Sequence, residues 1–431
     1  MKLAVVGTGY VGLVTGTCFA DIGNDVICVD NDEAKIAKLE RAEVPIYEPG
    51  LEEMVKRNKQ NGRLAFTTSI ADAVRTADII FVCVGTPPRE DGSADLSGIE
   101  SVSRAVAESM DSYKLIVEKS TVPVQTGQWV KKTIENFRKN EVDFDVASNP
   151  EFLREGSALE DFMEPDRVVI GVESEKAEKI LRALYEPLTS NIICTNIQSA
   201  EIIKHASNSF LATKISFINA VSNICERSGA DVRSVAEGMG FDTRINRYFL
   251  DAGIGFGGSC FPKDLKAFIH ISEKLGYSFD LLKEVQKINE KQKEMLLEKV
   301  SEMLWNLGGK TIAVWGLAFK PDTDDIREAP AIDIIERLLG EGARIKAFDP
   351  EATENAKKEL GDRIEYCGNA YETAEGADCV ILMTEWNDFK EVDWDKIKSL
   401  MNQPAVIDGR NIYKPAKLRD LGFRYMGIGR K

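Results

Sequence analysis

The amino-acid sequence predicts two doubly wound α/β domains joined by a mostly helical bridge. Three observations support this fold class. Strand-like and helical segments alternate near the start of the chain, a long helical stretch without glycine or proline occupies the middle, and the first pattern returns near the end. Such alternation predicts βαβ units, a parallel sheet and right-handed crossovers. The length of 431 residues agrees with several domains of roughly 150 residues each.

The first α/β domain is expected at residues 1–198. An apolar run at 3–6 precedes the segment Gly7-Thr8-Gly9-Tyr10-Val11-Gly12, which opens a helical stretch that reaches about residue 23. Further strand-like runs follow at 26–29, 79–84 and 115–117. Each run is short, apolar and followed by a turn or a helix, as in a buried parallel sheet.

The central segment, residues 199–308, is expected to be helical. Residues 199–226 contain no glycine or proline and keep apolar residues at helical spacing, so they predict one long helix, which Gly229 closes. A second long helical pattern runs from 280 to 307 and ends at Gly308-Gly309.

The second α/β domain is expected at residues 309–431. The runs at 311–316, 343–349 and 377–383 repeat the order of the strands in the first domain. The turn after the first run, 316–320, has one glycine and a lysine in place of the three spaced glycines. This difference predicts either a nucleotide of another kind in this domain or a purely structural role.

Composition excludes several classes of protein. Lys and Arg total 55 against 70 for Asp and Glu, a net charge of −15, which argues against nucleic acid or an anionic membrane as the main partner. No apolar run approaches the roughly 20 residues of a membrane span, and no signal peptide is evident. The eight cysteines are scattered, so we expect a reduced, cytoplasmic protein without a cysteine metal site. His205 and His270 are the only histidines, so we expect chemistry that does not depend on histidine.

The glycine-rich turn predicts a dinucleotide site. Gly7 permits the tight turn, Gly9 lets the backbone approach a pyrophosphate, and Gly12 lets the helix pack closely on the sheet. The start of the helix adds partial positive charge. Asp30 follows at the end of the next strand, where its carboxylate would bind the ribose hydroxyls and repel a 2′-phosphate, favouring NAD over NADP. Lys35 weakens this preference without reversing it.

Cys260 lies in the segment Gly255-Phe-Gly-Gly-Ser-Cys-Phe-Pro-Lys-Asp264. Glycine and serine let the backbone approach a ligand, and Pro262 suits the start of a helix whose first turn contains Asp264. A thiol at a helix start beside Lys263 should have enhanced thiolate character, which predicts a nucleophile. The alternative is a buried structural cysteine.

Other candidate residues lie on a helix and on loops. Lys204 and Asn208 are one turn apart, where an ammonium and an amide could stabilise an oxyanion, or could simply be structural. His205 faces elsewhere and is expected to be structural. The loop 149–156 and Thr121 follow predicted strands, as does the polar segment 319–327, and loops at the carboxyl ends of strands line the ligand crevice in such sheets.

The motifs together resemble the UDP-glucose/GDP-mannose dehydrogenase superfamily. The resemblance covers essentially the whole chain and rests on the following segments: Gly7–Gly12, Pro45-Ile-Tyr-Glu-Pro-Gly-Leu51, Gly85-Thr-Pro87, Ser120-Thr-Val-Pro123, Asn149–Gly156, Lys204-xxx-Asn208, Gly255–Asp264 and Phe319–Arg327. The segment Pro165–Gly171 resembles the UDP-glucose branch more than the GDP-mannose branch.

The resemblance implies two Rossmann-like domains and a four-electron oxidation of the sugar C6 alcohol of UDP-glucose to a carboxylate, with two NAD+ per sugar. It implies that Cys260 forms a thiohemiacetal and then a thioester, which water hydrolyses. Lys204, or a water held by Asp264, would take the hydroxyl proton. Thr121 and Asp264 would position the hydrolytic water, and Glu151 is a further candidate base.

The resemblance also implies the binding residues. The catalytic set is Cys260, Lys204, Asp264, Asn208, Thr121 and Glu151. The substrate set is Glu151, Phe152, Leu153, Arg154, Glu155, Lys204, Asn208, Arg244, Phe249, Leu250, Asp251, Ala252, Gly253, Gly257 and Lys320. The NAD set is Gly7, Gly9, Tyr10, Val11, Gly12, Asp30, Lys35, Thr86, Thr121, Glu155, Lys263 and Arg327. No metal is expected. Arg244 matches an arginine that reaches the partner's site in the family, which implies a homodimer through the long central helix.

Three alternatives stay open on the sequence. The substrate could be GDP-mannose or a UDP-N-acetylhexosamine, since those dehydrogenases belong to the same superfamily. A single-hydride hydroxyacid dehydrogenase of the 6-phosphogluconate type would also pair a nucleotide fold with a Lys-xxx-Asn helix, but would need neither Cys260 nor the last domain. A non-catalytic NAD sensor would bind NAD without forming NADH.

Overall fold

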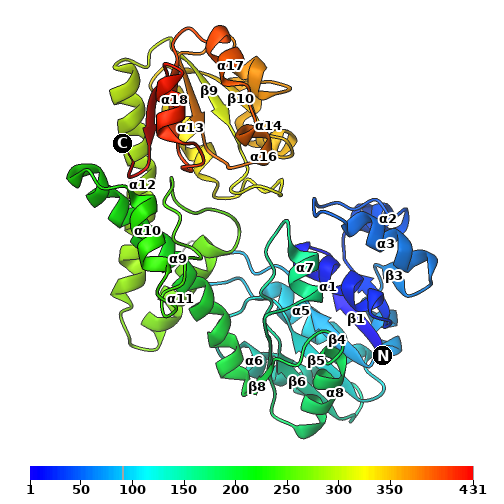
Figure 1. Cartoon of the computed structure of the whole chain (residues 1–431). Coiled ribbons are helices and arrows are strands. Elements are labelled where there is room, and N and C mark those ends of the chain that lie inside the picture. Colours follow the sequence, from blue (N-terminus) through cyan, green and yellow to red (C-terminus); the bar gives the residue numbers. More distant parts are fainter. Residues whose placement is uncertain (90–91, 431) are drawn as a thin grey trace. The chain divides into compact units, whose positions relative to one another are not determined.

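A computed structural model describes residues 1–89 and 92–430 of the chain. They form two compact units. The N-terminal unit contains residues 1–207 and 266–276, and the C-terminal unit contains residues 208–265 and 277–431. The long helix α9 (Ile197–Ser228) and helix α11 (Phe261–Lys274) each continue from one unit into the other. Figure 1 shows both helices in green.

The N-terminal unit is an α/β sandwich. Its elements are β1 (Lys2–Val6), α1 (Tyr10–Asp21), β2 (Asp25–Val29), α2 (Glu33–Glu40), α3 (Leu51–Gln60), β3 (Leu64–Thr67), α4 (Ile70–Thr76), β4 (Ile79–Val82), α5 (Ser97–Ser109), β5 (Lys114–Glu118), α6 (Thr126–Phe137), β6 (Phe144–Ser148), α7 (Ala158–Met163), β7 (Val168–Gly171), α8 (Glu175–Tyr185) and β8 (Ile192–Thr195).

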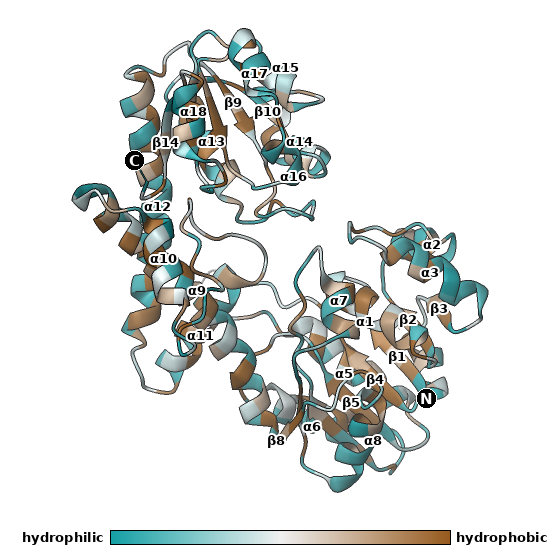
Figure 2. Ribbon diagram, in the orientation of Figure 1, coloured by the Kyte–Doolittle hydropathy of each residue, from teal (hydrophilic) through white to brown (hydrophobic). Residues whose placement is uncertain are grey.

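Its sheet has eight strands in the order β3-β2-β1-β4-β5-β6-β7-β8. The first six are parallel, and β7 pairs with β6 in the antiparallel direction. Alternate residues of each strand point to opposite faces. In β1, Leu3 and Val5 join the core beneath α1, α7 and α8, whereas Ala4 and Val6 join the core beneath α4, α5 and α6. Figure 2 shows these central strands in brown, the apolar end of the scale.

The C-terminal unit contains a second α/β sheet and several helices. Its elements are the later part of α9, α10 (Val232–Gly240), the start of α11, α12 (Asp280–Leu304), β9 (Thr311–Trp315), α13 (Pro330–Gly340), β10 (Arg344–Phe348), α14 (Thr353–Leu360), β11 (Glu365–Tyr366), α15 (Ala370–Ala374), β12 (Cys379–Leu382), α16 (Asn387–Lys390), α17 (Trp394–Leu400), β13 (Ala405–Asp408), α18 (Pro415–Asp420) and β14 (Arg424–Gly427).

The second sheet is parallel, with the order β11-β10-β9-β12-β13-β14. It has the same arrangement as strands β1 to β6, so the predicted repetition is confirmed. One apolar core joins this sheet to α9, α10 and α12 through buried residues such as Ile218, Val232 and Leu296. The predicted division of the chain at 198/199 and 308/309 stays a prediction.

The predicted fold class of two doubly wound α/β sheets with a long central helix is confirmed. Helix α9 spans the predicted residues, and Gly229 behind it has a φ of +82°, a conformation that favours glycine. Helix α12 ends at Leu304, a few residues earlier than expected, because Trp305 adopts a left-handed φ of +61°. No helix in the described ranges is long and apolar enough to cross a membrane.

Candidate active site

The glycine-rich turn between β1 and α1 has the geometry of a phosphate cradle. Gly7 has a φ of +99°, and a Cβ on Gly12 would lie 1.8 Å from the Gly7 carbonyl oxygen, so packing demands glycine at both positions. A Cβ on Gly9 would meet no protein atom within 4 Å, and its φ of −70° is ordinary. Neither packing nor backbone strain explains Gly9, and the open space beside it at the start of a helix fits a bound pyrophosphate.

Asp30 lies at the carboxyl end of β2, as predicted. Its Oδ2 accepts hydrogen bonds from the Thr8 backbone N–H at 2.9 Å and the Thr8 hydroxyl at 2.7 Å, and Lys35 Nζ is 3.0 Å away. Partial burial opposes ionisation, but these hydrogen bonds outweigh it and hold the pKa of Asp30 below its ordinary value. The carboxylate is therefore charged at neutral pH and fits recognition of ribose hydroxyls.

The loops after β4 and β5 place Thr86 and Thr121 beside each other. The Thr86 hydroxyl donates to the Thr121 carbonyl oxygen at 2.9 Å, and the Ser120 hydroxyl donates to the Val84 carbonyl oxygen at 2.8 Å. These bonds tie together the loops that follow β4 and β5. Both loops lie at the sheet edge where the sequence placed the ligand crevice.

Two buried carboxylates that the sequence analysis missed hold the Thr121 loop at its ends. Glu118 accepts from Ser120 N–H at 3.0 Å, and burial raises its pKa to about 8. Glu201, on α9, accepts from the N–H groups of Gln125 at 2.8 Å and Gly127 at 2.9 Å. Burial outweighs those bonds and raises the pKa of Glu201 as well. No local pattern signals the role of Glu201, because its partners are more than 70 positions away.

A buried ion pair joins the loop 149–156 to helix α9. Glu151 Oε1 lies 2.7 Å from Lys204 Nζ, and Glu151 Oε2 accepts from Leu153 N–H at 2.7 Å. Both charged side chains are almost fully buried. Burial alone would raise the pKa of Glu151, but the charge and hydrogen bond of Lys204 lower it below its ordinary value. The structure therefore brings two predicted site residues together, with opposite charges.

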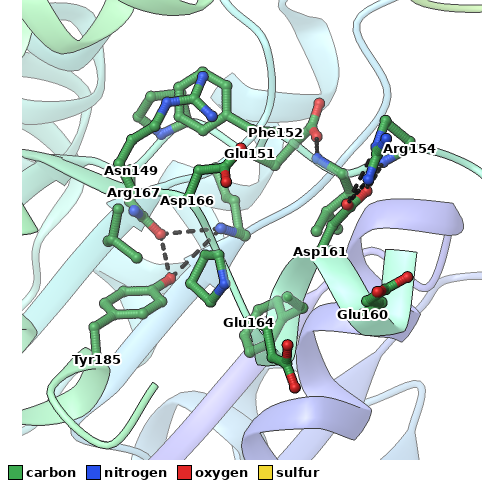
Figure 3. A pocket seen from close by; sticks show the side chains of 16 residues that line it. Asn149, Glu151, Phe152, Arg154, Glu160, Asp161, Glu164, Asp166, Arg167 and Tyr185 are labelled. Carbon is green, nitrogen blue, oxygen red and sulfur yellow. Dashed lines mark hydrogen bonds and ion pairs between the residues drawn. The ribbon is translucent and has the colours of Figure 1, made fainter. Parts of the chain in front are cut away.

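A polar cavity of about 230 Å³ lies beside this loop (Figure 3). Lys119, at its wall, donates to Asn149 Oδ1 at 3.0 Å, and Tyr185 bonds to the same oxygen. Burial lowers the pKa of Lys119 to about 8. The Arg167 guanidinium stacks on the Phe152 ring, 3.6 Å from its centroid. The cavity is lined by Lys119, Asn149–Arg154, Glu160–Phe162, Glu164–Val168 and Tyr185.

In the C-terminal unit, Cys260 immediately precedes α11. Its side chain is half-buried rather than sealed in an apolar core. The Asp264 N–H donates to the Cys260 carbonyl oxygen at 2.8 Å, which closes the first turn of the helix. Ser259 Oγ lies 3.6 Å from the Cys260 sulfur. The predicted helix start is confirmed, and the thiol has the partial exposure that a nucleophile needs.

Asp264 and Asn208 form a second buried pair. Asn208 Nδ2 donates to Asp264 Oδ2 at 2.6 Å, and only 1% of Asp264 is exposed. Asp264 Oδ1 makes no hydrogen bond among the described residues and lies 3.6 Å from Lys263 Nζ. An acceptor oxygen in this position suits a bound water. Lys204 belongs to the N-terminal unit and Asn208 to the C-terminal unit, on successive turns of α9.

The glycines before Cys260 have a reason that the sequence analysis did not identify. A Cβ on Gly257 would lie 2.2 Å from the Glu328 carbonyl oxygen, and one on Gly258 would lie 2.7 Å from the Phe319 ring. Their close neighbour is the chain's own segment 319–328. Arg410, also missed, bonds to the Gly255 carbonyl oxygen at 3.0 Å and follows β13, at the sheet edge where polar residues are expected.

The remaining predicted residues occupy loops of the C-terminal unit. Arg327 pairs with Asp325 at 2.7 Å, and Lys320 Nζ is 5.7 Å from the Phe319 ring centroid. In the segment 249–253, Leu250 and Ala252 are buried and Asp251 pairs with Arg247. The Arg244 side chain is 87% exposed and pairs with Asp242.

His205 lies among structural contacts. His205 Nε2 lies 2.8 Å from the Val122 carbonyl oxygen, and its ring stacks on Phe268, which is a structural environment. Across the residues that the structure describes, no group of three His, Cys, Asp or Glu side chains could hold a metal ion.

Family models match most of the chain. Residues 1–189 match the NAD binding domain of the UDP-glucose/GDP-mannose dehydrogenase family, residues 198–291 match its central domain and residues 313–415 match its UDP binding domain.

Full-length relatives agree with these matches. The chain is 50% identical to the UDP-glucose 6-dehydrogenase TuaD of Bacillus subtilis over 429 residues, covering 100% of this chain and 93% of the relative. It is 45% identical to the UDP-glucose 6-dehydrogenase of Pseudomonas aeruginosa, covering 100% and 98%.

Two solved structures have the same fold. A UDP-glucose dehydrogenase from Pyrobaculum islandicum superimposes with a TM-score of 0.94 at 40% identity, covering 100% of this chain and 98% of that one. A UDP-D-ManNAc dehydrogenase from Pyrococcus horikoshii superimposes with a TM-score of 0.88 at 30% identity, covering 100% and 99%.

Proposed function

This chain belongs to the UDP-glucose/GDP-mannose dehydrogenase family, and we propose that it oxidises the C6 alcohol of UDP-glucose to the carboxylate of UDP-glucuronate. The balanced reaction is R–CH2OH + 2 NAD+ + H2O → R–COO− + 2 NADH + 3 H+. The observation that carries the choice of substrate is the 50% identity, over the whole chain, with a UDP-glucose 6-dehydrogenase. Three solved structures named for N-acetylated sugars are 30%, 26% and 26% identical to this chain.

The fit of NAD to this chain rests on its own residues. The open space beside Gly9 and the charged Asp30 carboxylate would hold the pyrophosphate and the ribose. Thr86, Thr121, Lys263 and Arg327 are proposed as further contacts. When bound, NAD+ accepts the hydride that leaves C6 in each of the two oxidations.

In the first oxidation, Asp264 takes the proton of the C6 hydroxyl through a water held by its Oδ1, and the Lys204 ammonium stabilises the developing alkoxide. The Cys260 thiolate then attacks the resulting aldehyde, forming a C–S bond while the carbonyl electron pair moves to oxygen. Lys204 and Asn208 stabilise that oxyanion. Such stabilisation is strongest where the donors are fixed and water is excluded. Their buried ion pair and hydrogen bond supply this fixed orientation.

The second hydride loss leaves a thioester on Cys260. Asp264, together with Thr121, positions a water and takes its proton as the oxygen attacks the thioester carbon, with Glu151 as an alternative base. The C–S bond breaks, the electron pair returns to sulfur and the carboxylate leaves. Both Glu151 oxygens already have partners in Lys204 and the Leu153 N–H, whereas Asp264 Oδ1 makes no hydrogen bond among the described residues, so we assign the water to Asp264 first.

The test is an NADH assay with UDP-glucose, a UDP-N-acetylhexosamine and GDP-mannose, with the stoichiometry of the product measured. We expect two NADH per UDP-glucose and little from the other sugars. Cys260→Ser should abolish the second NADH, and acid-quenched wild-type enzyme should contain a mass adduct on the Cys260 peptide. Cys367→Ser, at another partly buried cysteine, is the control. Two NADH per sugar from Cys260→Ser would exclude the thioester route.

We also propose a homodimer formed through α9. Phe210, Phe217 and Ile224 recur every seventh residue, so they share one face of the helix, and they are 65%, 52% and 65% exposed. An apolar stripe of this kind in water indicates a partner surface. Arg244 would then reach the partner's site, as the resemblance implies. The scattered reduced cysteines fit the cytoplasm.

A further inference from the structure

Glu48 connects two loops of the N-terminal unit that are far apart in the sequence. The Tyr10 hydroxyl donates to Glu48 Oε2. The N–H of Gly156 donates to the same oxygen at 2.7 Å and to the Tyr10 oxygen at 2.9 Å. The N–H of Ala158 donates to Glu48 Oε1 at 2.7 Å. Both carboxylate oxygens therefore accept hydrogen bonds, and the carboxylate is almost fully buried, at 6% exposed.

The segment around Glu48 holds the carboxylate in a fixed place. The Leu51 N–H donates to the Glu48 carbonyl oxygen at 3.1 Å, and Gly50 between them has φ +80° and ψ −6°. Proline followed by such a glycine is the pattern of a type II turn. Leu51 is fully buried, and a Cβ on Gly50 would lie 3.5 Å from Leu159 of α7. The turn at the end of the Pro45–Leu51 segment therefore holds the Glu48 side chain in one position.

The two connected loops are the two binding loops of this unit. Tyr10 is the first residue of α1 and directly follows Gly9, where the pyrophosphate is proposed to lie. Gly156 ends the loop 149–156, directly after Glu155, which is proposed to contact both ligands. At its other end this loop is fixed by the Asn149 bonds to Lys119 and to the Val169 carbonyl oxygen. Glu48 fixes the end that faces the glycine-rich turn.

We propose that Glu48, with the Tyr10 hydroxyl, is a positioning group that couples the cofactor turn to the substrate loop, so that NAD binding orders the end of the loop 149–156. This inference rests on the proposed function only for the identity of the sugar nucleotide. The glutamine variant breaks the link because glutamine has one acceptor oxygen, whereas both oxygens of Glu48 receive N–H or O–H donors.

The experiment uses the whole chain with NADH, which binds without turnover. In the wild type, NADH should slow hydrogen exchange at residues 153–158. Glu48→Gln and Tyr10→Phe should remove that protection and weaken NADH binding at least about fivefold, a change of the size expected for losing a buried hydrogen bond. The double variant should be no weaker than Glu48→Gln alone, because the Tyr10 hydroxyl acts through Glu48.

Tyr113→Phe is the matched control, because the Tyr113 hydroxyl also bonds a carboxylate, Asp145, at 2.7 Å in the same unit. It should leave NADH binding and the protection unchanged, even if its melting temperature falls. Equal NADH-induced protection in Glu48→Gln, or none in the wild type, overturns the proposal. A separate calorimetric titration of the wild type with UDP-glucose, in the presence of NADH, tests the substrate. If UDP-glucose does not bind, the proposed substrate is refuted, whereas the measurements with NADH alone still decide the role of Glu48.

Discussion

Lys204 illustrates how one residue depends on its neighbours. Its ammonium is buried beside Glu151, 2.7 Å away, and this pairing keeps both groups charged where water is excluded. An isolated ammonium in such a place would lose its proton more readily. The charge that we assign to oxyanion stabilisation is therefore maintained by a carboxylate from a distant loop.

Lys204→Ala should lower kcat far more than it raises KM for UDP-glucose, because the ammonium acts on charge that develops in the transition state. It should also raise the pKa of Glu151, since the carboxylate stays buried without its partner, and reduce stability by about 3 kcal/mol. Steady-state kinetics measures the changes in kcat and KM, and denaturant unfolding measures the loss of stability. A nearly normal kcat would refute the assignment.

Glu118 should make stability depend on pH. Its pKa rises from 4.5 in the unfolded chain to about 8 in the folded one, so the unfolded state releases the proton first as pH rises. The free energy of unfolding should therefore fall between those values because of this residue. Glu118→Gln should be more stable than the wild type by roughly 2 to 4 kcal/mol above pH 8 and no more stable below pH 4.5.

Urea unfolding at several pH values tests this expectation. Glu108→Gln, at an exposed position of α5 paired with Lys139, is the control and should show no such gain. A gain for Glu118→Gln that does not change with pH would mean that packing, and not ionisation, is responsible.

At the scale of elements, α9 serves several purposes on different faces. Its first turns pack closely on α6 and β7. A Cβ on Gly127 of α6 would lie 2.7 Å from Ile197, and a Cβ on Gly171 of β7 would lie 2.7 Å from Ala200. The next turns carry Glu201, which caps the start of α6, and the paired Lys204. Farther along, the helix leaves its apolar stripe exposed.

Phe217→Glu should convert the proposed dimer to a monomer at micromolar concentration, because a carboxylate in the middle of an apolar stripe would be buried without a partner. Light scattering coupled to size exclusion measures the mass. Trp305→Glu, which changes a 93% exposed aromatic residue outside the stripe, should leave the mass unchanged. A Phe217→Glu protein of dimeric mass would place the interface elsewhere.

At the scale of the whole molecule, the two sheets share one strand order but use the carboxylate after their second strand differently. Asp30 bonds to Thr8 and Lys35. Asp349, the matching residue after β10, is 2% exposed, and its oxygens accept from the backbone N–H groups of Leu317 and Ala318 and from Trp386. Asp349 is therefore buried and bonded to groups of its own unit, whereas Asp30 is only partly buried and paired with a lysine.

A fragment of residues 1–198 should fold with a lower melting temperature than the full chain. It lacks Glu201 and Ala200, so the start of α6 loses its buried acceptor and the space beside Gly171 is left empty. Thermal unfolding and hydrogen exchange at α6 measure the loss. If the fragment were as stable as the full chain and α6 were equally protected, residues 1–198 would fold independently of the rest of α9.

The sequence could predict much of the fold because its signals are local. The spacing of Gly7, Gly9 and Gly12 determines a turn within six residues, and the absence of glycine and proline over 199–226 determines a helix. Cys260 was placed at a helix start by Pro262 and its neighbours, and α11 begins there. Signals of this kind depend on backbone conformation, which neighbouring residues control.

By itself, then, the sequence determined the two repeated α/β patterns, the dinucleotide turn, the long helix and the family's candidate residues. Only the tertiary structure decided which groups meet: Glu151 with Lys204, Asn208 with Asp264, and Glu48 with both the Tyr10 hydroxyl and the Gly156 N–H. These partners are tens to more than a hundred residues apart, so no periodicity relates them. Their distances and charges follow from how helices pack on sheets, because a buried polar group must find its partner wherever the packing leaves one.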